Sequence, residues 1–559
     1  MPGVVLGGVK RKRQEGDAVV KSRKAPRAST NGGSSGSQQA KVLLLEEQIA
    51  EGRRHYNNIV ELQSLAGNVA KKPTTATLAA VALCRVFCRM MAGEQLVKRS
   101  GANEADGQVV LWLRERVKEY VEALTSVWIG SPDAAQESTA LTLLMRLVKE
   151  ETSQQSRRSE QAWRTSTGPF GLLVTALLEK TPAEGARQEF VEKYVEEHDD
   201  VRFYTFLAIK QYFDRNRDSI DDGHVANAID ILAQIEGVPE SQDQLEDWYG
   251  AAPLPENKQL MSLNAHRKTA QEAWLAVFRC GLSRNQRKRI LGVATTNILP
   301  WFTTRIELLV DFLTDSFNEG GSVSLLALGS IFHLMTQRNL DYPDFYTKLY
   351  SLLDEDVLHS KHRSRFFRLL DQFMSSTHLP ATMVASFIKR LARLSLQAPP
   401  GAIVWIVPWT YNMLKQHPAC TFMLHRTYHP AHSIYNQNPA YEETGIVKDT
   451  FDAKETDPTA TGAIDSSLWE LETLASHDHP NVATLAKILS EQFTKREYSL
   501  EDFLDHSYGT LLDNELSRDL KKAPVVEWEI PKRIITSEEE AGGLNGIGQL
   551  LQKAIDARA

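Results

Sequence analysis

From Val42 onward, the sequence repeats one pattern: an apolar-faced stretch of roughly 12 to 18 residues, followed by a short Gly, Pro or Asp/Ser interruption. Within residues 305 to 317, Leu309, Leu313 and Phe317 recur at the four-residue spacing of one helical face. We find no reliable run of alternating β-branched residues bounded by hairpin turns. The pattern therefore predicts an all-α fold.

The length of the expected helices limits how they can pack. Helix, loop and helix recur at roughly forty residues without a crisp sequence repeat. A single long bundle needs longer helices, whereas paired short helices hide their apolar faces against neighbouring pairs. We therefore expect an irregular HEAT/armadillo-like solenoid of helical hairpins.

Composition shifts divide the chain into five segments. A Gly/Ser-rich stretch ends the first, and a stretch rich in Pro, Asp and Gln interrupts the helical pattern near the middle. We predict a disordered basic tail (1–38), an N-terminal helical region (39–236), a linker or surface loop (237–265), a C-terminal helical region (266–520) and an extended C-terminal tail (521–559).

Charge is distributed unevenly along the chain. The first forty residues carry eight Lys or Arg against two acidic residues, a charge of +6. Because the net charge of the chain is −7, the remaining residues carry −13. A basic tail on an acidic body indicates different partners for the two parts. The tail has two basic clusters that resemble a bipartite nuclear localisation signal, although a solvated or nonspecifically RNA-binding tail is the alternative. The clusters comprise Lys10, Arg11, Lys12, Arg13, Lys21, Arg23 and Lys24.

The sequence offers little for catalysis or cofactor binding. The phosphate-cradling GxxxxGK[ST] loop, the GxSxG elbow and the HExxH zinc pair are all missing from it. Cys84 and Cys88, four residues apart, are interpreted as buried apolar residues, and His425, His429 and His432 as loop histidines. We expect no catalytic, cofactor or metal site, and no small-molecule substrate. A helical enzyme with an unrecognised site is the remaining alternative.

Other features constrain the environment of the chain. Four scattered cysteines favour a reducing compartment over a disulfide framework. The opening MPGVVLGGVKRKR reverses the order of a secretory signal, and GAIVWIVPWTYNML is too short to span a bilayer. We therefore expect no membrane association.

Two groups of cations are candidate contacts for RNA or an acidic partner. In SFIKRLARLSLQAPPGA, we expect Lys389, Arg390 and Arg393 to be exposed, opposite an apolar stripe that docks the helix. The two following prolines should end this helix, and the next should begin near Gly401. For both groups, a merely solvated helix face is the alternative. The second group comprises Arg284, Arg287, Lys288 and Arg289.

Several motifs resemble a known family. The patterns FYTKLYSLL and FIKRLARLSLQAPP, within residues 343 to 420, resemble the CCAAT-binding-factor-like domain of nucleolar complex proteins. DSSLWELETLASHDHPNVATLAKILSEQF and EYSLEDFLDHSYGTLLDNEL resemble the nucleolar complex protein 4 family in particular. The resemblance spans about 300 to 520.

The resemblance implies a function that composition does not. It implies a nucleolar, non-enzymatic assembly factor of the small ribosomal subunit that joins other proteins of the small-subunit processome on pre-rRNA. It also implies a heterodimer with nucleolar protein 14. A nuclear transport or transcription adaptor is the alternative.

The acidic body adds a physical constraint, because a protein that coats RNA by itself is usually basic over a broad face. We therefore expect recruitment mainly through proteins, with RNA contact local or indirect. Trp528, in the Pro-flanked VVEWEIPKR, is the candidate partner contact.

Overall fold

The computed structural model describes most of the chain. The described residues contain helices and turns but no β-strand, which confirms the predicted all-α class. They are 35–97, 104–156, 163–253, 259–338, 342, 344–376, 378–425, 449–504, 506–517 and 546–557.

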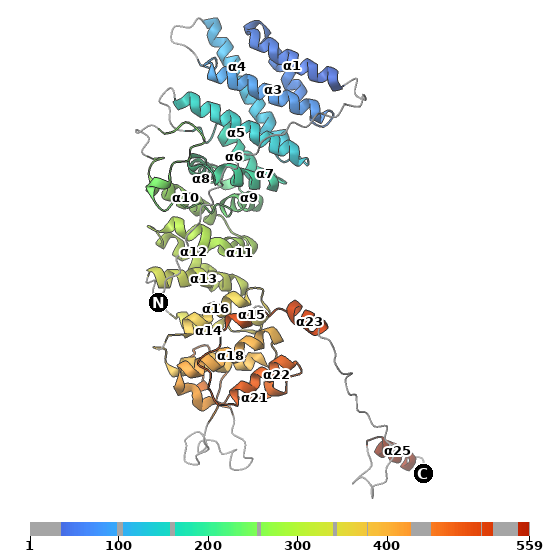
Figure 1. The fold of residues 1–559 in the computed structure, drawn as a ribbon, viewed down its shortest axis with the longest axis vertical. Coiled ribbons are helices and arrows are strands. Elements are labelled where there is room, and N and C mark those ends of the chain that lie inside the picture. The colour runs from blue at the N-terminus through green and yellow to red at the C-terminus, as the bar shows by residue number, and fades with distance from the viewer. Residues whose placement is uncertain are drawn as a thin grey trace, which may run out of the picture. The chain divides into compact units, whose positions relative to one another are not determined.

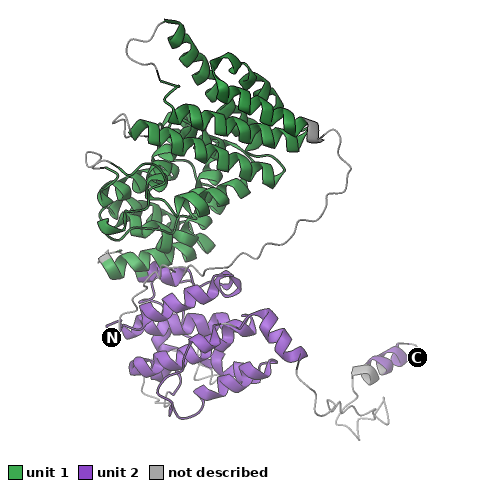
Figure 2. Ribbon diagram, turned by 45° about the horizontal axis from the view of Figure 1, so that its top comes forward, with its two compact units in different colours: residues 1–345 green, residues 346–559 purple. Residues whose placement is uncertain are grey.

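The chain forms two compact units, which are described separately. The N-terminal unit is Met1–Phe345 and the C-terminal unit is Tyr346–Ala559 (Figure 2). The predicted linker at 237–265 thus lies inside the N-terminal unit.

The N-terminal unit is a succession of stacked helices, as the helical-repeat prediction requires (Figure 1). Consecutive helices pack against one another, for example α2 on α3 and α12 on α13, and α8 also packs on α10, the second helix after it. Each pair covers the apolar face of the next, which is how a solenoid builds its core. The helices are α1 (Ser35–Glu51), α2 (Asn58–Ala66), α3 (Pro73–Ala92), α4 (Glu104–Ala123), α5 (Ala134–Ser156), α6 (Pro169–Glu179), α7 (Glu184–Phe190), α8 (Asp199–Arg215), α9 (Asp222–Leu232), α10 (Leu263–Phe278), α11 (Arg284–Val293), α12 (Glu307–Asn318) and α13 (Gly321–Arg338).

The first helix begins earlier than the sequence suggested. Helix α1 starts at Ser35, so the end of the Gly/Ser-rich stretch, which we placed in the tail (1–38), is helical. The seven cations of the predicted nuclear localisation signal lie outside the described residues.

Helix α3 is a long and largely apolar helix of the N-terminal unit. It is the one helix of the described ranges that is long and apolar enough to cross a membrane, but 61% of that apolar window is buried inside the protein. Helices α1, α2 and α5 pack around it. Cys84 and Cys88 both point into this packing, with their Sγ atoms 3.9 Å apart. This arrangement is that of a core helix.

The loop between α9 and α10 is fixed to the N-terminal unit by two buried carboxylates at the start of α8. Asp200 accepts hydrogen bonds from the Tyr249 and Gly250 amides at 3.0 and 2.9 Å. The Asp199 carboxylate accepts a hydrogen bond from the Asp247 amide at 3.3 Å, and the Asp199 amide donates to the Asp247 carbonyl at 2.8 Å. Burial raises the pKa of Asp200, although these backbone amides oppose the shift. The loop is therefore an integral part of the surface of this unit.

The C-terminal unit is built around helix α18, which is buried along almost all of its length. Trp405 stacks on Phe367 with ring centroids 4.0 Å apart, and Trp409 stacks on Trp405 at 5.6 Å. These rings form the centre of the core. The helices of this unit are α14 (Phe345–Ser351), α15 (Glu355–His359), α16 (Arg363–Met374), α17 (Ala381–Ser395), α18 (Pro400–Gln416), α21 (Trp469–Thr473), α22 (Pro480–Ala486), α23 (Tyr508–Leu516) and α25 (Gly546–Asp556).

The predicted hairpin of α17 and α18 is confirmed. Helix α17 ends at Ser395, Pro399 caps α18 and Pro400 is its first residue, because a proline at this position needs no amide donor. At the other end of the unit, the tail predicted to be extended contains helix α25. Trp528 lies outside the described residues.

Candidate functional site

The apolar stripe predicted on α17 is largely buried. Val384, Phe387, Ile388 and Leu391 are fully enclosed, and Leu394 is half-buried. These side chains seat α17 in the C-terminal unit, where it packs against α18. The docking part of the prediction is therefore confirmed.

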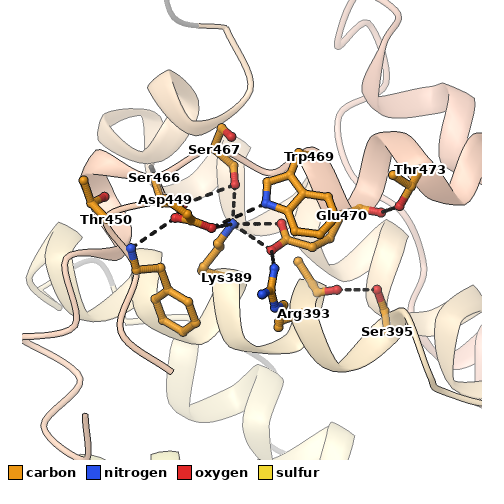
Figure 3. Close-up of polar contacts among 12 residues, drawn as sticks. Lys389, Arg393, Ser395, Asp449, Thr450, Ser466, Ser467, Trp469, Glu470 and Thr473 are labelled. Carbon is orange, nitrogen blue, oxygen red and sulfur yellow. Dashed lines mark hydrogen bonds and ion pairs between the residues drawn. The ribbon is translucent and has the colours of Figure 1, made fainter. Parts of the chain in front are cut away.

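The prediction that Lys389 is exposed is wrong. Its side chain is 0% exposed, and its Nζ donates to the Glu470 carboxylate at 2.7 to 2.9 Å and to the Ser467 carbonyl at 2.6 Å (Figure 3). The Asp449 carboxylate lies 3.1 Å away. Because a buried ammonium is stable only when it is paired, the surrounding carboxylates explain this placement. Lys389 therefore cannot contact RNA in this structure.

The carboxylates around Lys389 are themselves fully engaged. Asp449 accepts a hydrogen bond from the Ser466 hydroxyl at 2.5 Å, and Glu470 also pairs with Arg393 at 3.3 Å. Burial raises the pKa of Asp449, but hydrogen bonds from Ser466 and the Phe451 amide, together with Lys389, outweigh burial and hold it below its ordinary value. We call Lys389, Arg393, Asp449 and Glu470 the α17 charge cluster.

The other cations of α17 also hold neighbouring segments. Arg390 donates to the Leu353 carbonyl at 2.7 Å and to the Ala453 carbonyl at 3.3 Å, and its guanidinium lies over Tyr350. The Arg393 guanidinium carbon lies 5.0 Å from the centroid of the Trp469 ring, and the Arg393 side chain remains 47% exposed. Arg390 and Arg393 therefore stabilise contacts within the C-terminal unit. Their contact with RNA or an acidic partner stays a prediction.

A surface hollow of about 430 Å³ adjoins these two arginines. Its lining combines both signs of charge, because Asp354, Glu355 and Asp356 lie opposite Arg390 and Arg393. Phosphate binding there would be weakened by the three carboxylates. The α17 surface is thus a poorer RNA site than its sequence suggested.

The cluster fastens a distant segment onto α17. Lys389 and Glu470 are 81 residues apart in sequence, and Ser386, also on α17, donates to the Pro458 carbonyl at 2.6 Å. Sequence reasoning missed Asp449 and Glu470. Glu470 lies in the family-like stretch DSSLWELETLASHDHPNVATLAKILSEQF, but the resemblance does not show which distant side chain it pairs with. The segment that they secure, residues 449 to 474, covers the polar face of α17 that we predicted to face solvent.

The α11 cations are more accessible. Arg284 is 58% exposed and Arg289 is 50% exposed. Arg287 and Arg284 lie 3.6 and 3.9 Å from the Glu319 carboxylate, Arg289 pairs with Asp230, and Lys288 forms no ion pair with a described carboxylate. Arg284 pairs through an exposed side chain at 3.9 Å, and a pair of this kind contributes about 0 to 1 kcal/mol, so Arg284 can exchange partners. Helix α11 is the better candidate for local RNA contact.

We expect the double variant Arg284→Glu/Lys288→Glu to bind single-stranded RNA more weakly than the parent. Two lost phosphate contacts should reduce the log–log salt slope by about 1.4, at about 0.7 per contact. Fluorescence anisotropy of a labelled RNA oligonucleotide over a salt series measures the slope. The control is Arg217→Glu/Lys268→Glu, which removes two exposed cations of the same unit outside α11. An equal change in both variants would reject α11 as the contact.

The remaining described surface offers no metal centre. Among the described residues, no group of three or more His, Cys, Asp or Glu side chains has an arrangement that could hold a metal ion. His429 and His432 lie outside these residues.

Two family profiles match the chain. Residues 31–218 match "Nucleolar complex protein 4-like, TPR repeats", and residues 324–486 match the "CBF/Mak21 family". The first match extends the similarity well beyond the region where we recognised it in the sequence. Its description names TPR repeats, which stack helical hairpins into a solenoid as HEAT and armadillo repeats do.

Curated relatives align over nearly the whole chain. An uncharacterized protein of Schizosaccharomyces pombe is 40% identical over 503 residues, covering 88% of this chain and 98% of the relative. Nucleolar complex protein 4 of Saccharomyces cerevisiae is 34% identical over 543 residues, covering 89% and 97%. The human nucleolar complex protein 4 homolog is 32% identical over 443 residues, covering 78% and 81%.

Proposed function

The chain belongs to the nucleolar complex protein 4 family of nucleolar ribosome-biogenesis proteins, and from this premise we propose that it is a non-enzymatic assembly factor of the small ribosomal subunit. In this role it acts in pre-rRNA processing within the small-subunit processome, as a heterodimer with nucleolar protein 14. The observation that carries the proposal is the family match over both units.

The architecture supports a scaffold. Stacked helices expose long, irregular surfaces along which a partner's helix or extended segment can bind. The buried charges of the α17 charge cluster are compensated by one another and hold the fold together. A role in positioning other macromolecules agrees with these features.

The charge of the body supports recruitment through proteins. Excluding the first forty residues, the chain carries −13, which opposes broad phosphate binding. Lys389, one of the expected RNA contacts, is buried and forms an internal ion pair with Glu470. RNA contact is accordingly assigned to local sites such as α11.

We expect affinity purification of the full-length tagged chain, at physiological salt, to recover nucleolar protein 14 in near-equal amount, together with other processome proteins. Quantitative mass spectrometry against an untagged control measures this recovery. The alternative, a nuclear transport or transcription adaptor, predicts transport receptors or transcription complexes instead. Recovery of those proteins without nucleolar protein 14 would contradict the proposal.

A further inference from the structure

Helix α23 presents an apolar stripe that no described part of the chain covers. Tyr508, Leu512 and Leu516 are spaced four residues apart and are 61%, 59% and 75% exposed. Residues four apart lie on one face of a helix, so the three side chains form one continuous stripe. Leu511, on an adjacent face, is buried against the C-terminal unit. We call Tyr508, Leu512 and Leu516 the α23 stripe.

The helix that carries this stripe is held firmly at its start. The Ser364 hydroxyl donates to the Leu504 carbonyl at 3.1 Å, and Arg363 donates to the His506 carbonyl at 3.0 Å. Helix α18 approaches the same segment closely, because a Cβ on Gly401 would lie 2.3 Å from the His506 carbonyl oxygen. The stripe therefore has a fixed position relative to the core of its unit.

The N-terminus of α23 is also well capped. Ser507 accepts a hydrogen bond from the Thr510 amide at 3.1 Å, while the Thr510 hydroxyl accepts one from the Ser507 amide at 2.9 Å. The Tyr508 hydroxyl lies 3.3 Å from His359 Nδ1, which restrains the first ring of the stripe. A preformed helix loses little conformational entropy when a partner binds.

Carboxylates border the stripe on both sides. At about 100° per residue, Asp513 and Glu515 fall on opposite flanks of the line through Tyr508, Leu512 and Leu516. Neither carboxylate forms an ion pair with a described residue, and α23 contains no Lys or Arg. The surface is therefore apolar along its centre and negative along its edges.

We propose that the α23 stripe is the docking site for an amphipathic helix of another protein, with apolar residues every three to four positions and Lys or Arg on both flanks. Apolar contact along the stripe would supply the burial, and the cations would pair with Asp513 and Glu515. This proposal goes beyond the assembly function and does not depend on which protein supplies the helix.

The charges argue against three other occupants. A second copy of α23 would bring the same carboxylates together, and like charges oppose association. The chain's own α25 has an exposed apolar face, but Lys553 is its one cation and Asp556 its one carboxylate. Helix α25 therefore cannot place a cation along each edge of the stripe. RNA would meet two carboxylates and no cation on α23.

The test places a photo-crosslinking amino acid, p-benzoylphenylalanine, at position 512 of the full-length chain in cells. We expect crosslinked peptides from another protein with the apolar and basic helical pattern described above. The matched control carries the crosslinker at Asn514, which is exposed on the opposite side of α23 and should capture that peptide far less. Products mainly from a second copy, from α25 or from RNA, or none above the control, would overturn the proposal.

Variants of the stripe provide a second measurement. In chains without the crosslinker, affinity purification measures how much of the partner identified by crosslinking is recovered. Leu512→Asp/Leu516→Asp should reduce this recovery by about tenfold or more, because residues at the centre of an interface contribute most of its affinity. Asp513→Lys/Glu515→Lys should reduce recovery as well, and Leu512→Met should retain it. Unchanged recovery in both double variants would reject α23 as the docking site while leaving the family role intact.

Discussion

Replacing Lys389 by methionine is expected to destabilise the C-terminal unit by about 3 to 5 kcal/mol, because it leaves the Glu470 carboxylate buried without its main partner. Both side chains are 0% exposed. Loss of this pair should also release residues 449 to 474 from α17. Urea unfolding gives the free energy, and limited proteolysis within 449 to 474 reports the release.

Two further variants separate a charge effect from a packing effect. The double variant Lys389→Met/Glu470→Met should recover much of the lost stability, because replacing both members of a buried pair with apolar residues is often nearly neutral. Arg368→Ala, which breaks the exposed Arg368–Glu501 pair, should cost at most about 1 kcal/mol. A double variant as unstable as Lys389→Met would contradict the assigned role of the pair.

Glu151→Gln is expected to remove a loss of stability that the N-terminal unit undergoes as the pH rises from about 4.5 to about 7. Burial raises the pKa of Glu151 to about 7, which Arg164, 3.9 Å away, only partly opposes. Because the folded pKa lies above the unfolded value of about 4.5, this contribution is complete below about pH 4.5, falls as the pH rises toward 7, and is fully lost above about pH 7. A shift of this size corresponds to about 3 kcal/mol by pH 8.

Hydrogen exchange of peptides from α5, measured between pH 5 and 8 and corrected for intrinsic exchange, follows this loss. Burial lowers the pKa of His266 to about 4, so its contribution to stability has the opposite sign and rises with pH up to about 6.5. Comparison of the variant with the parent removes this contribution, because both chains carry His266. The control is Glu150→Gln, at a neighbouring residue that pairs with Arg146 near the surface, and it should keep the parent's pH dependence. A parent chain whose α5 protection stays constant across the window would contradict the prediction.

The fold was largely predictable because helical periodicity is a local property. Val384, Phe387, Ile388 and Leu391 are buried as their spacing indicates, and the two prolines separate α17 from α18 where expected. The exposed stripe on α23 is equally regular in sequence. Its exposure could not be predicted, because the same spacing in α12 buries Leu309, Leu313 and Phe317.

The candidate site was less predictable because it depends on contacts between distant residues. On a helical wheel, Lys389 falls on the polar arc of α17, which we expected to face solvent. The structure buries it because Asp449 and Glu470, from a much later segment, cover that arc. Periodicity records which side chains are polar but cannot show whether water or another part of the chain satisfies them.

Three features of the molecule suit it to binding partners. Stacked helices and an internal charge cluster give a stable framework, α11 offers local cations and α23 offers an apolar stripe with acidic edges. We propose that this framework positions partners during small-subunit assembly and performs no chemistry of its own.

The RNA that accompanies the purified full-length chain tests that claim most directly. Sequencing this RNA should show strong enrichment of small-subunit precursor rRNA over large-subunit precursors, relative to an untagged control. Equal enrichment of both precursors, or enrichment of large-subunit precursors alone, would contradict the account.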